Sequence, residues 1–298
     1  MKPFFALLWA FSALSSAWAY DWPAPDMQVI RTFGQKTQGA VLPGVEVQTL
    51  SPVLAAPENG DVLFVFQPAS QEVQNLPSSL GGFIALSHDD NLRTVTTRID
   101  PAVDANKRSY RRGEPLGPTE VQPGVSESRH RLFVFDQQLG ELVNPLLVYP
   151  QVTDGKAPLF YDVRAYPEGG LGTSVSLFGQ GTLAVGYWTI HVVVSDPVTL
   201  VPAAGKERGV EGQRGVYGIE AYLNGGEVFN TNLDSIQEKA GRWQIKGMQA
   251  FLDDVLVQDQ EWNLGQVFIN QGTNILEVVI KDFKGNQTGK TFRVLGTR

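Results

Sequence analysis

Residues 33–66 read FGQKTQGAVLPGVEVQTLSPVLAAPENGDVLFVF, and this stretch decides the fold class of the 298-residue chain. It ends in the apolar run DVLFVF, which follows a turn-forming segment rich in proline, asparagine and glycine. Short apolar runs bounded by such residues are typical of β-strands. The pattern recurs in FIALSH, TVTTRID, HRLFVFD, WTIHVVVSD and ILEVVIKD. We therefore predict an all-β protein, with residues 235–239 as its one short candidate helix.

The first 19 residues have the features of a secretion signal. Lys2 gives a positive start, FFALLWAFSAL an apolar stretch, and Ala17-Trp18-Ala19 a small-x-small cleavage site. The apolar run is short for a membrane span, although an uncleaved anchor is an alternative. We expect cleavage after Ala19 and a mature chain from Tyr20. The product would be secreted or periplasmic, with no membrane span after cleavage.

Composition excludes several kinds of site. The chain has no cysteine, so it has no lipobox, no disulfide and no thiolate metal ligand. Its formal net charge is −7, and loss of Lys2 with the signal makes it about −8. Because an acidic chain binds nucleic acid poorly, we expect no nucleic-acid partner.

Residues 150–158 contain two prolines and an Asp-Gly turn, and predict a domain boundary. We expect one domain over residues 20–150 and a second over 151–298. In the second, predicted strands at 158–166, 186–196 and 215–223 and a hairpin at 274–295 indicate a β-sandwich. The Asp282-x-x-Gly285-Asn286 turn of that hairpin resembles the turn of bacterial immunoglobulin-like modules. Trp188, Trp243 and Trp262 are expected in its core.

The opening stretch also resembles a known family. Residues 42–46, LPGVE, precede a run that begins Pro52-Val53 and ends in DVLFVF. This order resembles the His-x-Gly-Val-Asp-Ile motif and following hairpin of the lysostaphin-type (LytM-like) zinc endopeptidases, which cut peptide crosslinks in bacterial cell walls. In that family the His and the Asp bind zinc. The resemblance places Leu42 and Glu46 at these two positions.

Later segments continue the resemblance. Residues 80–88, LGGFIALSH, resemble the family's Gly-Tyr-Gly-Asn-x-Val-x-Ile-x-His strand. Residues 94–99, TVTTRI, place Arg98 where the family has a catalytic His. Residues 130–145, HRLFVFDQQLGELVNP, resemble the His-x-His segment, with His130 at its catalytic first His and Leu132 at its zinc-binding second His. This last segment can be shifted by one residue, and neither register contains His-x-His.

The resemblance therefore implies a degenerate peptidase domain that has lost its zinc. A catalytic zinc needs three protein ligands and an open position for water. Leu42 and Leu132 have no lone pair to offer, and a cation at Arg98 would repel the metal. We expect no catalysis and no metal cofactor, and a former substrate cleft lined by Leu42, Glu46, Arg98, His130 and Leu132. An active metallo-endopeptidase with substitute ligands, Glu46 and His130 among them, is the enzymatic alternative.

Other polar residues receive structural interpretations. Glu46 and Arg98 are expected to form a salt bridge across the cleft or to be solvated. His130 is expected at a strand end or in the cleft, His88 at the surface or in a turn, and His191 on a strand facing solvent. Residues 107–112 predict a solvated basic loop, with contact to an acidic wall polymer or a partner protein as the alternative.

These interpretations favour a secreted, catalytically inactive peptidase homologue. Its partner would be peptidoglycan, bound in the former cleft, or a cell-wall hydrolase that it regulates. A structural or adhesive envelope protein, in which the first domain only spaces the second, is a third hypothesis.

Overall fold

The computed structural model describes residues 20–68, 79–101, 107–120, 127–150, 154–170, 173–179, 181–200 and 210–298. The expected signal peptide, residues 1–19, lies outside them. Within these ranges, no helix is long and apolar enough to cross a membrane. Regular structure there is strand except for α1 (Leu252–Val255) and the 3-10 turns η2 (Pro145–Leu147) and η3 (Glu168–Gly170). The all-β prediction is confirmed.

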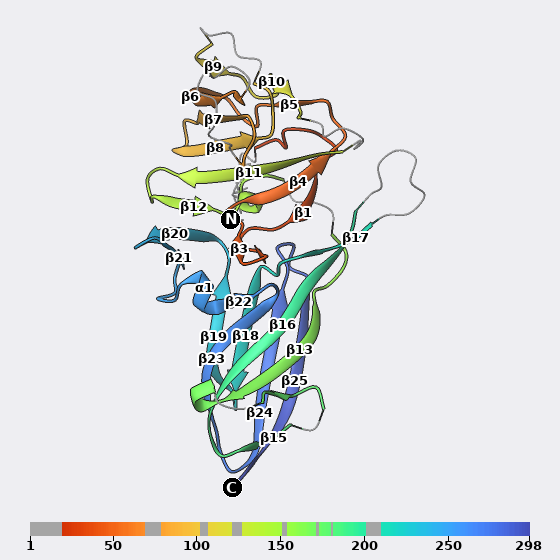
Figure 1. Ribbon diagram of the computed structural model, residues 1–298, viewed down its shortest axis with the longest axis vertical. Helices are drawn as coiled ribbons and strands as arrows, with labels where there is room; N and C mark the ends of the chain where they lie inside the picture. The colour runs from red at the N-terminus through yellow and green to blue at the C-terminus, as the bar shows by residue number, and fades with distance from the viewer. Residues whose placement is uncertain are drawn as a thin grey trace, which may run out of the picture.

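The amino-terminal half builds most of a sheet that has ten strands among the described residues. Its order is β21-β20-β12-β11-β8-β7-β6-β9, with β4 also beside β11 and β1 beside β4 (Figure 1). The strands from this half are β1 (Gln28–Arg31), β4 (Val45–Thr49), β6 (Gly60–Phe66), β7 (Phe83–Ser87), β8 (Leu92–Thr97), β9 (Ser109–Tyr110), β11 (Ser128–Asp136) and β12 (Glu141–Val143). Two small pairs accompany them: β2 (Lys36–Thr37) with β3 (Ala40–Val41), and β5 (Val53–Ala55) with β10 (Pro115–Pro118).

Strand β11 explains how this sheet forms its core. Alternate residues of a strand point to opposite faces, and in SRHRLFVFD the residues Ser128, His130, Leu132 and Val134 are all buried. They pack with Val45 and Val47 of β4 and with Ile84 and Leu86 of β7. We call this buried side the inner face and the opposite side the outer face.

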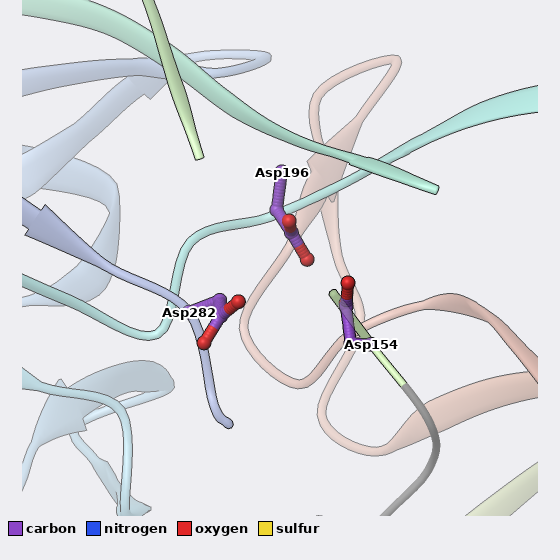
Figure 2. Close-up of side chains that lie close together, drawn as sticks. All are labelled: Asp154, Asp196 and Asp282. Atoms are coloured by element: carbon purple, nitrogen blue, oxygen red, sulfur yellow. The ribbon is translucent and has the colours of Figure 1, made fainter. Parts of the chain in front are cut away.

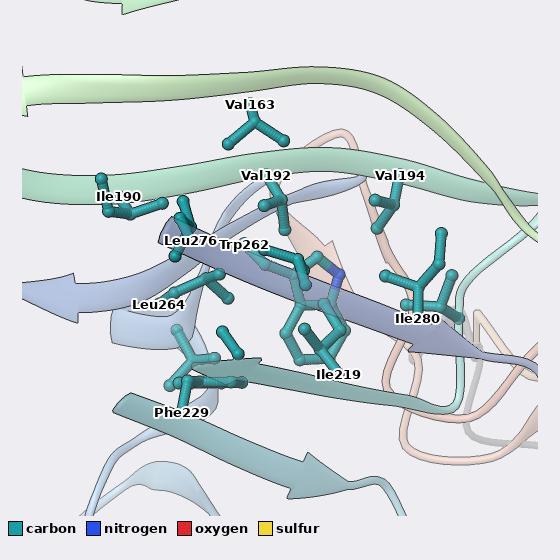
Figure 3. Close-up of a cluster of buried hydrophobic side chains, with 14 of the residues drawn as sticks. Val163, Ile190, Val192, Val194, Ile219, Phe229, Trp262, Leu264, Leu276 and Ile280 are labelled. Atoms are coloured by element: carbon teal, nitrogen blue, oxygen red, sulfur yellow. The ribbon is translucent and has the colours of Figure 1, made fainter. Parts of the chain in front are cut away.

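The carboxy-terminal half forms a sandwich of two sheets. One contains β13 (Leu159–Pro167), β14 (Val175–Ser176), β16 (Gly186–Leu200), β17 (Val210–Arg214), β22 (Leu256–Gln258) and β23 (Glu261–Ile269). The other contains β15 (Gly181–Ala184), β18 (Gly218–Leu223), β19 (Gly226–Asn232), β24 (Gly272–Lys281) and β25 (Gln287–Thr297). Strand pairs are antiparallel except β15 with β25. Figure 3 shows the two sheets meeting over apolar side chains, with Trp262 between Val192 and Ile219.

A hairpin from the carboxy-terminal half joins the first sheet. It consists of β20 (Ser235–Lys239) and β21 (Arg242–Ile245), and β20 pairs with β12 through Leu142 opposite Ile236 and Val143 opposite Ser235. Residues 235–239 are therefore a strand, and the helix prediction was wrong. Strand pairing on both sides of this segment, together with burial of Ile236, overrides its weak local helical preference.

A second contact also crosses between the halves. Phe33, which precedes the first sheet's β4, is buried in the apolar core of the sandwich. Gly34 follows it with a φ of 74°, and a Cβ there would stand 2.8 Å from Leu233. Thr32 Oγ1 donates a hydrogen bond to the Gly215 carbonyl. The expected first and second domains thus share a packed junction (Figure 1).

Candidate functional site

The five predicted site residues divide between the two faces of the first sheet. Residues directly opposite each other in an antiparallel ladder share a face. His130 lies opposite Val47, and Leu132 lies opposite Val45 and Thr96, on the inner face. Glu46 lies opposite Arg131, on the outer face. The sheet therefore separates Glu46 from His130 and Leu132.

The register also shows which residues of β11 lie beside Glu46. The β11 residues that share a face with Glu46 are Arg129, Arg131 and Phe133, not His130 and Leu132. The sequence HRLFVFD predicts a strand whose successive side chains point to opposite faces. Apolar residues occur at both the odd and the even positions of this strand. Only the partner strands show which phase faces the core, so the pattern alone could not identify Arg131 and Phe133.

Glu46 is held by arginines from both neighbouring strands. Its Oε2 lies 3.2 Å from Nη1 of Arg31 on β1 and 4.0 Å from Nε of Arg131 on β11. The predicted salt bridge of Glu46 with Arg98 does not form. Arg98 follows the end of β8 with a φ of 55°, and its amide donates to the Leu80 carbonyl. This left-handed turn takes Arg98 out of the ladder, while Arg31 and Arg131 stand directly beside Glu46.

His130 is a core residue. It is fully buried, with Nδ1 2.8 Å from the Thr97 carbonyl and Nε2 2.8 Å from Ser128 Oγ. Burial lowers the pKa of His130, the bond to the Thr97 carbonyl opposes this, and the charge of Arg98 lowers the pKa further. The expected position at a strand end or in a cleft was wrong, because the even phase of β11 packs inward.

The residues at the predicted zinc positions do not fit a zinc ion. Leu42 and Leu132 are buried and apolar, and Leu42 is held by backbone hydrogen bonds with Gly34 and Gln35. Glu46 is engaged by two cations, and both ring nitrogens of His130 have partners on the opposite face. Three ligands converging on one point are needed for catalytic zinc, and these positions supply no such set.

The outer face presents arginine and aromatic side chains. Arg131 stands opposite Glu46, and Phe133 stands opposite Val95 of β8. The face continues across β7 and β6, where Phe83 packs against Phe64 and Phe66 with ring centroids 5.6 and 5.5 Å apart. The side chain of Phe64 is 52% exposed. The family motifs concern metal ligands, so they do not indicate this arginine and phenylalanine surface in the sequence.

Three arginines of the amino-terminal half keep unused donors. The Nε atoms of Arg31, Arg93 and Arg131 are each buried, and none has a hydrogen-bond partner among the described residues. Arg93 lies opposite Phe135 on β11, two positions along the outer face from Phe133. Guanidinium groups suit carboxylate ligands, which they can bind in a bidentate manner. The buried Nε atoms themselves are not accessible to a ligand from solvent.

The other histidines differ from expectation. His88 is buried rather than at the surface, with Nδ1 2.7 Å from the Asn59 carbonyl and Nε2 2.9 Å from Thr94 Oγ1. The ring of Tyr20 covers it, with centroids 4.9 Å apart. His191 is half-buried rather than facing solvent, because Glu261 on the paired strand β23 places Oε1 2.8 Å from its Nδ1.

The basic loop and the tryptophans are also placed. Arg112 forms ion pairs with Asp21 and Glu58, and Lys107 with Glu114, so both residues have acidic partners within the chain. Trp262 is buried in the sandwich core, and Trp188 and Trp243 are partly buried against it.

The comparisons with known proteins match only part of this sequence, or match it at low similarity. No curated protein matches the sequence. A protein-family model matches residues 169–295, which is less than half of the chain. This match does not assign the whole chain to a family.

Three solved structures illustrate the structural similarities. The SpoIIQ–SpoIIIAH pore-forming complex has 15% identity and a TM-score of 0.32 over 45% of this chain and 92% of that chain. A zinc-containing peptidase from Vibrio cholerae has 15% identity and a TM-score of 0.33 over 45% and 41%. The solution structure of lysostaphin has 11% identity and a TM-score of 0.35 over 95% and 99%. All three TM-scores are below 0.5, so no functional conclusion is drawn from them.

Proposed function

We propose that this protein is a non-catalytic component of the bacterial cell envelope that binds peptidoglycan on the outer face of its first sheet. The observation that carries the proposal is the pairing of Glu46 with Arg31 and Arg131 on a face that also exposes phenylalanines. An arginine pair occupies the carboxylate that a zinc enzyme of the resembling family would use as a ligand. The same side chains make a surface suited to an acidic ligand.

The charge of this face differs from that of the chain. The chain carries a formal net charge of −7. Around Glu46 the balance is reversed, because Arg31 and Arg131 pair with it and Arg129 stands on the same face opposite Gln48. A further carboxylate on this face is that of Asp61, on β6. Peptidoglycan has carboxylates on its stem peptides and sugar rings with apolar faces. Guanidinium groups suit the first and exposed aromatic rings suit the second.

Lack of catalysis is part of the proposal. Hydrolysis of an amide bond needs an activated nucleophile and a group that stabilises the developing oxyanion. His130, the best candidate base, is buried with both nitrogens engaged, and Glu46 is paired with cations. These contacts support a binding role over an enzymatic one.

A pelleting assay with purified wall sacculi tests the proposal. We expect the mature chain to be retained without releasing soluble muropeptides. Arg129→Glu should reduce retention about tenfold, because a lost charge-assisted contact of about 1.5 kcal/mol corresponds to that factor. Arg293→Glu makes the same charge change at an exposed site on β25 of the sandwich and should retain binding.

Two outcomes would contradict parts of this proposal. Release of muropeptides by the pure chain would restore the enzymatic alternative. Absence of retention would remove peptidoglycan as the ligand and leave a wall hydrolase as the candidate partner of the same face. An equal loss of sacculus retention in Arg129→Glu and Arg293→Glu would show that retention depends on the net charge of the protein and not on the outer face.

A further inference from the structure

Three aspartates from distant parts of the chain meet beside the junction of the two halves. Asp154 precedes β13, Asp196 lies on β16, and Asp282 follows β24. One carboxylate oxygen from each lies within 4.8 Å of those of the other two. Figure 2 shows the three carboxylates directed toward a shared space.

Two of the three carboxylates have partners. Asp282 accepts hydrogen bonds from the amide of Asn286 at 2.8 Å and from its Nδ2 at 2.7 Å. Asp154 accepts from the Lys156 amide at 3.0 Å and pairs with Nη2 of Arg214. These contacts fix the orientation of both carboxylates.

Asp196 lacks such partners. Its side chain is only 4% exposed, its Oδ1 is buried with no hydrogen bond, and its Oδ2 lies 3.4 Å from Nε of Arg214. Burying a carboxylate costs free energy unless it is paired and hydrogen-bonded. The buried Oδ1 of Asp196 has no partner among the described residues and is therefore available to a ligand.

The charges of the cluster indicate what this ligand is. Three carboxylates face one guanidinium, that of Arg214, which leaves an excess of two negative charges; Lys284 also lines the cavity, but it is an exposed residue. One divalent cation would neutralise the excess.

We propose that Asp154, Asp196 and Asp282 bind one Ca²⁺ ion. Ca²⁺ takes oxygen ligands at about 2.3–2.6 Å, so ligands on opposite sides of it stand about 4.6–5.2 Å apart. Carboxylate oxygens that all lie within 4.8 Å of one another are close enough to share one such ion. All three ligands are carboxylates, a donor set that suits Ca²⁺ and not Zn²⁺, which favours nitrogen and sulfur.

A cavity lined by Asp154 and Asp196, next to Asp282, has room for such an ion. Its volume of about 20 Å³ accommodates about one water-sized particle. Its walls also include Thr32, Phe33 and Asn144 from the amino-terminal half. A bound Ca²⁺ would therefore lie where the two halves meet and would stabilise their junction.

Calcium titration of the mature chain after dialysis against a chelator tests the proposal. Calorimetry should give one Ca²⁺ per chain with a Kd on the order of 10⁻⁴–10⁻³ M, the range of extracellular calcium modules. Thermal unfolding should shift upward with Ca²⁺ and less with equal Mg²⁺. Asp196→Asn should weaken Ca²⁺ binding at least tenfold. Asp253→Asn, which alters an exposed carboxylate on α1, should leave binding unchanged.

The metal-free form of Asp196→Asn separates loss of binding from loss of folding. Because the substitution removes a buried charge without hydrogen bonds, this form should unfold at or above the temperature of metal-free wild type. If the variant fails to fold, Asp154→Asn takes its place with the same expected loss of binding. Absence of Ca²⁺ binding by wild type, or unchanged binding in the folded variant, would overturn the proposal.

Discussion

At the scale of single residues, the two faces of one strand decide what the first sheet can do. Alternate residues of β11 send His130 and Leu132 into the core and leave Arg131 and Phe133 outside beside Glu46. A one-residue shift in such a strand exchanges all its inward and outward side chains. The chemistry of the outer face is therefore that of arginine and phenylalanine.

The pairing of Glu46 gives a prediction at this scale. Glu46→Gln should lower the free energy of unfolding by about 1–3 kcal/mol, because it removes a charge-assisted hydrogen bond and leaves Arg31 and Arg131 without their shared acid. Chemical denaturation measures this change. Glu277→Gln, at an exposed position of β24, should change stability by less than about 0.5 kcal/mol. Equal effects would contradict the assignment.

His130 gives a prediction on pH. Its pKa is lowered in the folded protein, mainly by burial. The stability that it contributes is present above its unfolded pKa of about 6.5 and is lost as the pH falls below that value, because the unfolded state then binds more protons. His130→Gln should flatten the fall in unfolding free energy as the pH drops below about 6.5. An unchanged slope would show that the ring is not buried in its neutral form.

At the scale of elements, the sequence indicates most strands because their apolar runs lie between clear turn residues. DVLFVF, WTIHVVVSD and ILEVVIKD correspond to β6, β16 and β24. The helix prediction for residues 235–239 was wrong because this segment pairs with β12, which is about 90 residues away in sequence. The local sequence pattern does not indicate which distant strand a segment pairs with.

The β12–β20 pairing can be tested with one buried side chain. Ile236 is fully buried, and Ile236→Ala should cost about 2–5 kcal/mol of unfolding free energy through lost burial and a cavity. Glu238→Ala changes an exposed residue of the same strand and should be nearly neutral. Hydrogen exchange should show protection of the Val143 and Ile236 amides lost together in Ile236→Ala. A small effect would mean that Ile236 does not pack in the apolar cluster that joins Leu142 of β12 to the sandwich core.

The candidate site was less predictable than the fold for the same reason. The partners of Glu46 come from β1 and β11, and no sequence motif identifies them. The aspartate cluster unites positions 154, 196 and 282, which no local spacing connects. His88 was assigned to the surface because its covering group, Tyr20, lies far away in sequence.

At the scale of the whole molecule, the halves of the chain are joined by more than a linker. Strand β20 extends the first sheet, Phe33 enters the sandwich core, and the aspartate cavity has walls from both halves. In Figure 1 the hairpin of β20 and β21 lies between the upper sheet and the lower sandwich. Such shared packing favours cooperative unfolding of the two halves.

Calorimetry tests this coupling. Wild type should unfold in one transition, and Phe33→Ala should lower the unfolding free energy by about 3–5 kcal/mol, as for other buried aromatic truncations. Phe268→Ala, at a side chain that is largely exposed on β23, should have a much smaller effect. Two separate transitions in wild type would contradict the coupling and would favour independent domains on either side of residues 150–158.

The central claim is that the chain works by binding and without a catalytic zinc, and its most direct test is the zinc content of the purified mature protein. Elemental mass spectrometry before and after incubation with excess zinc should find a zinc-to-chain ratio far below one after dialysis. Asp196→Asn is measured in parallel, so that metal held by the aspartate cluster is recognised as such. About one tightly held zinc per chain that persists in Asp196→Asn would contradict the claim and restore the peptidase.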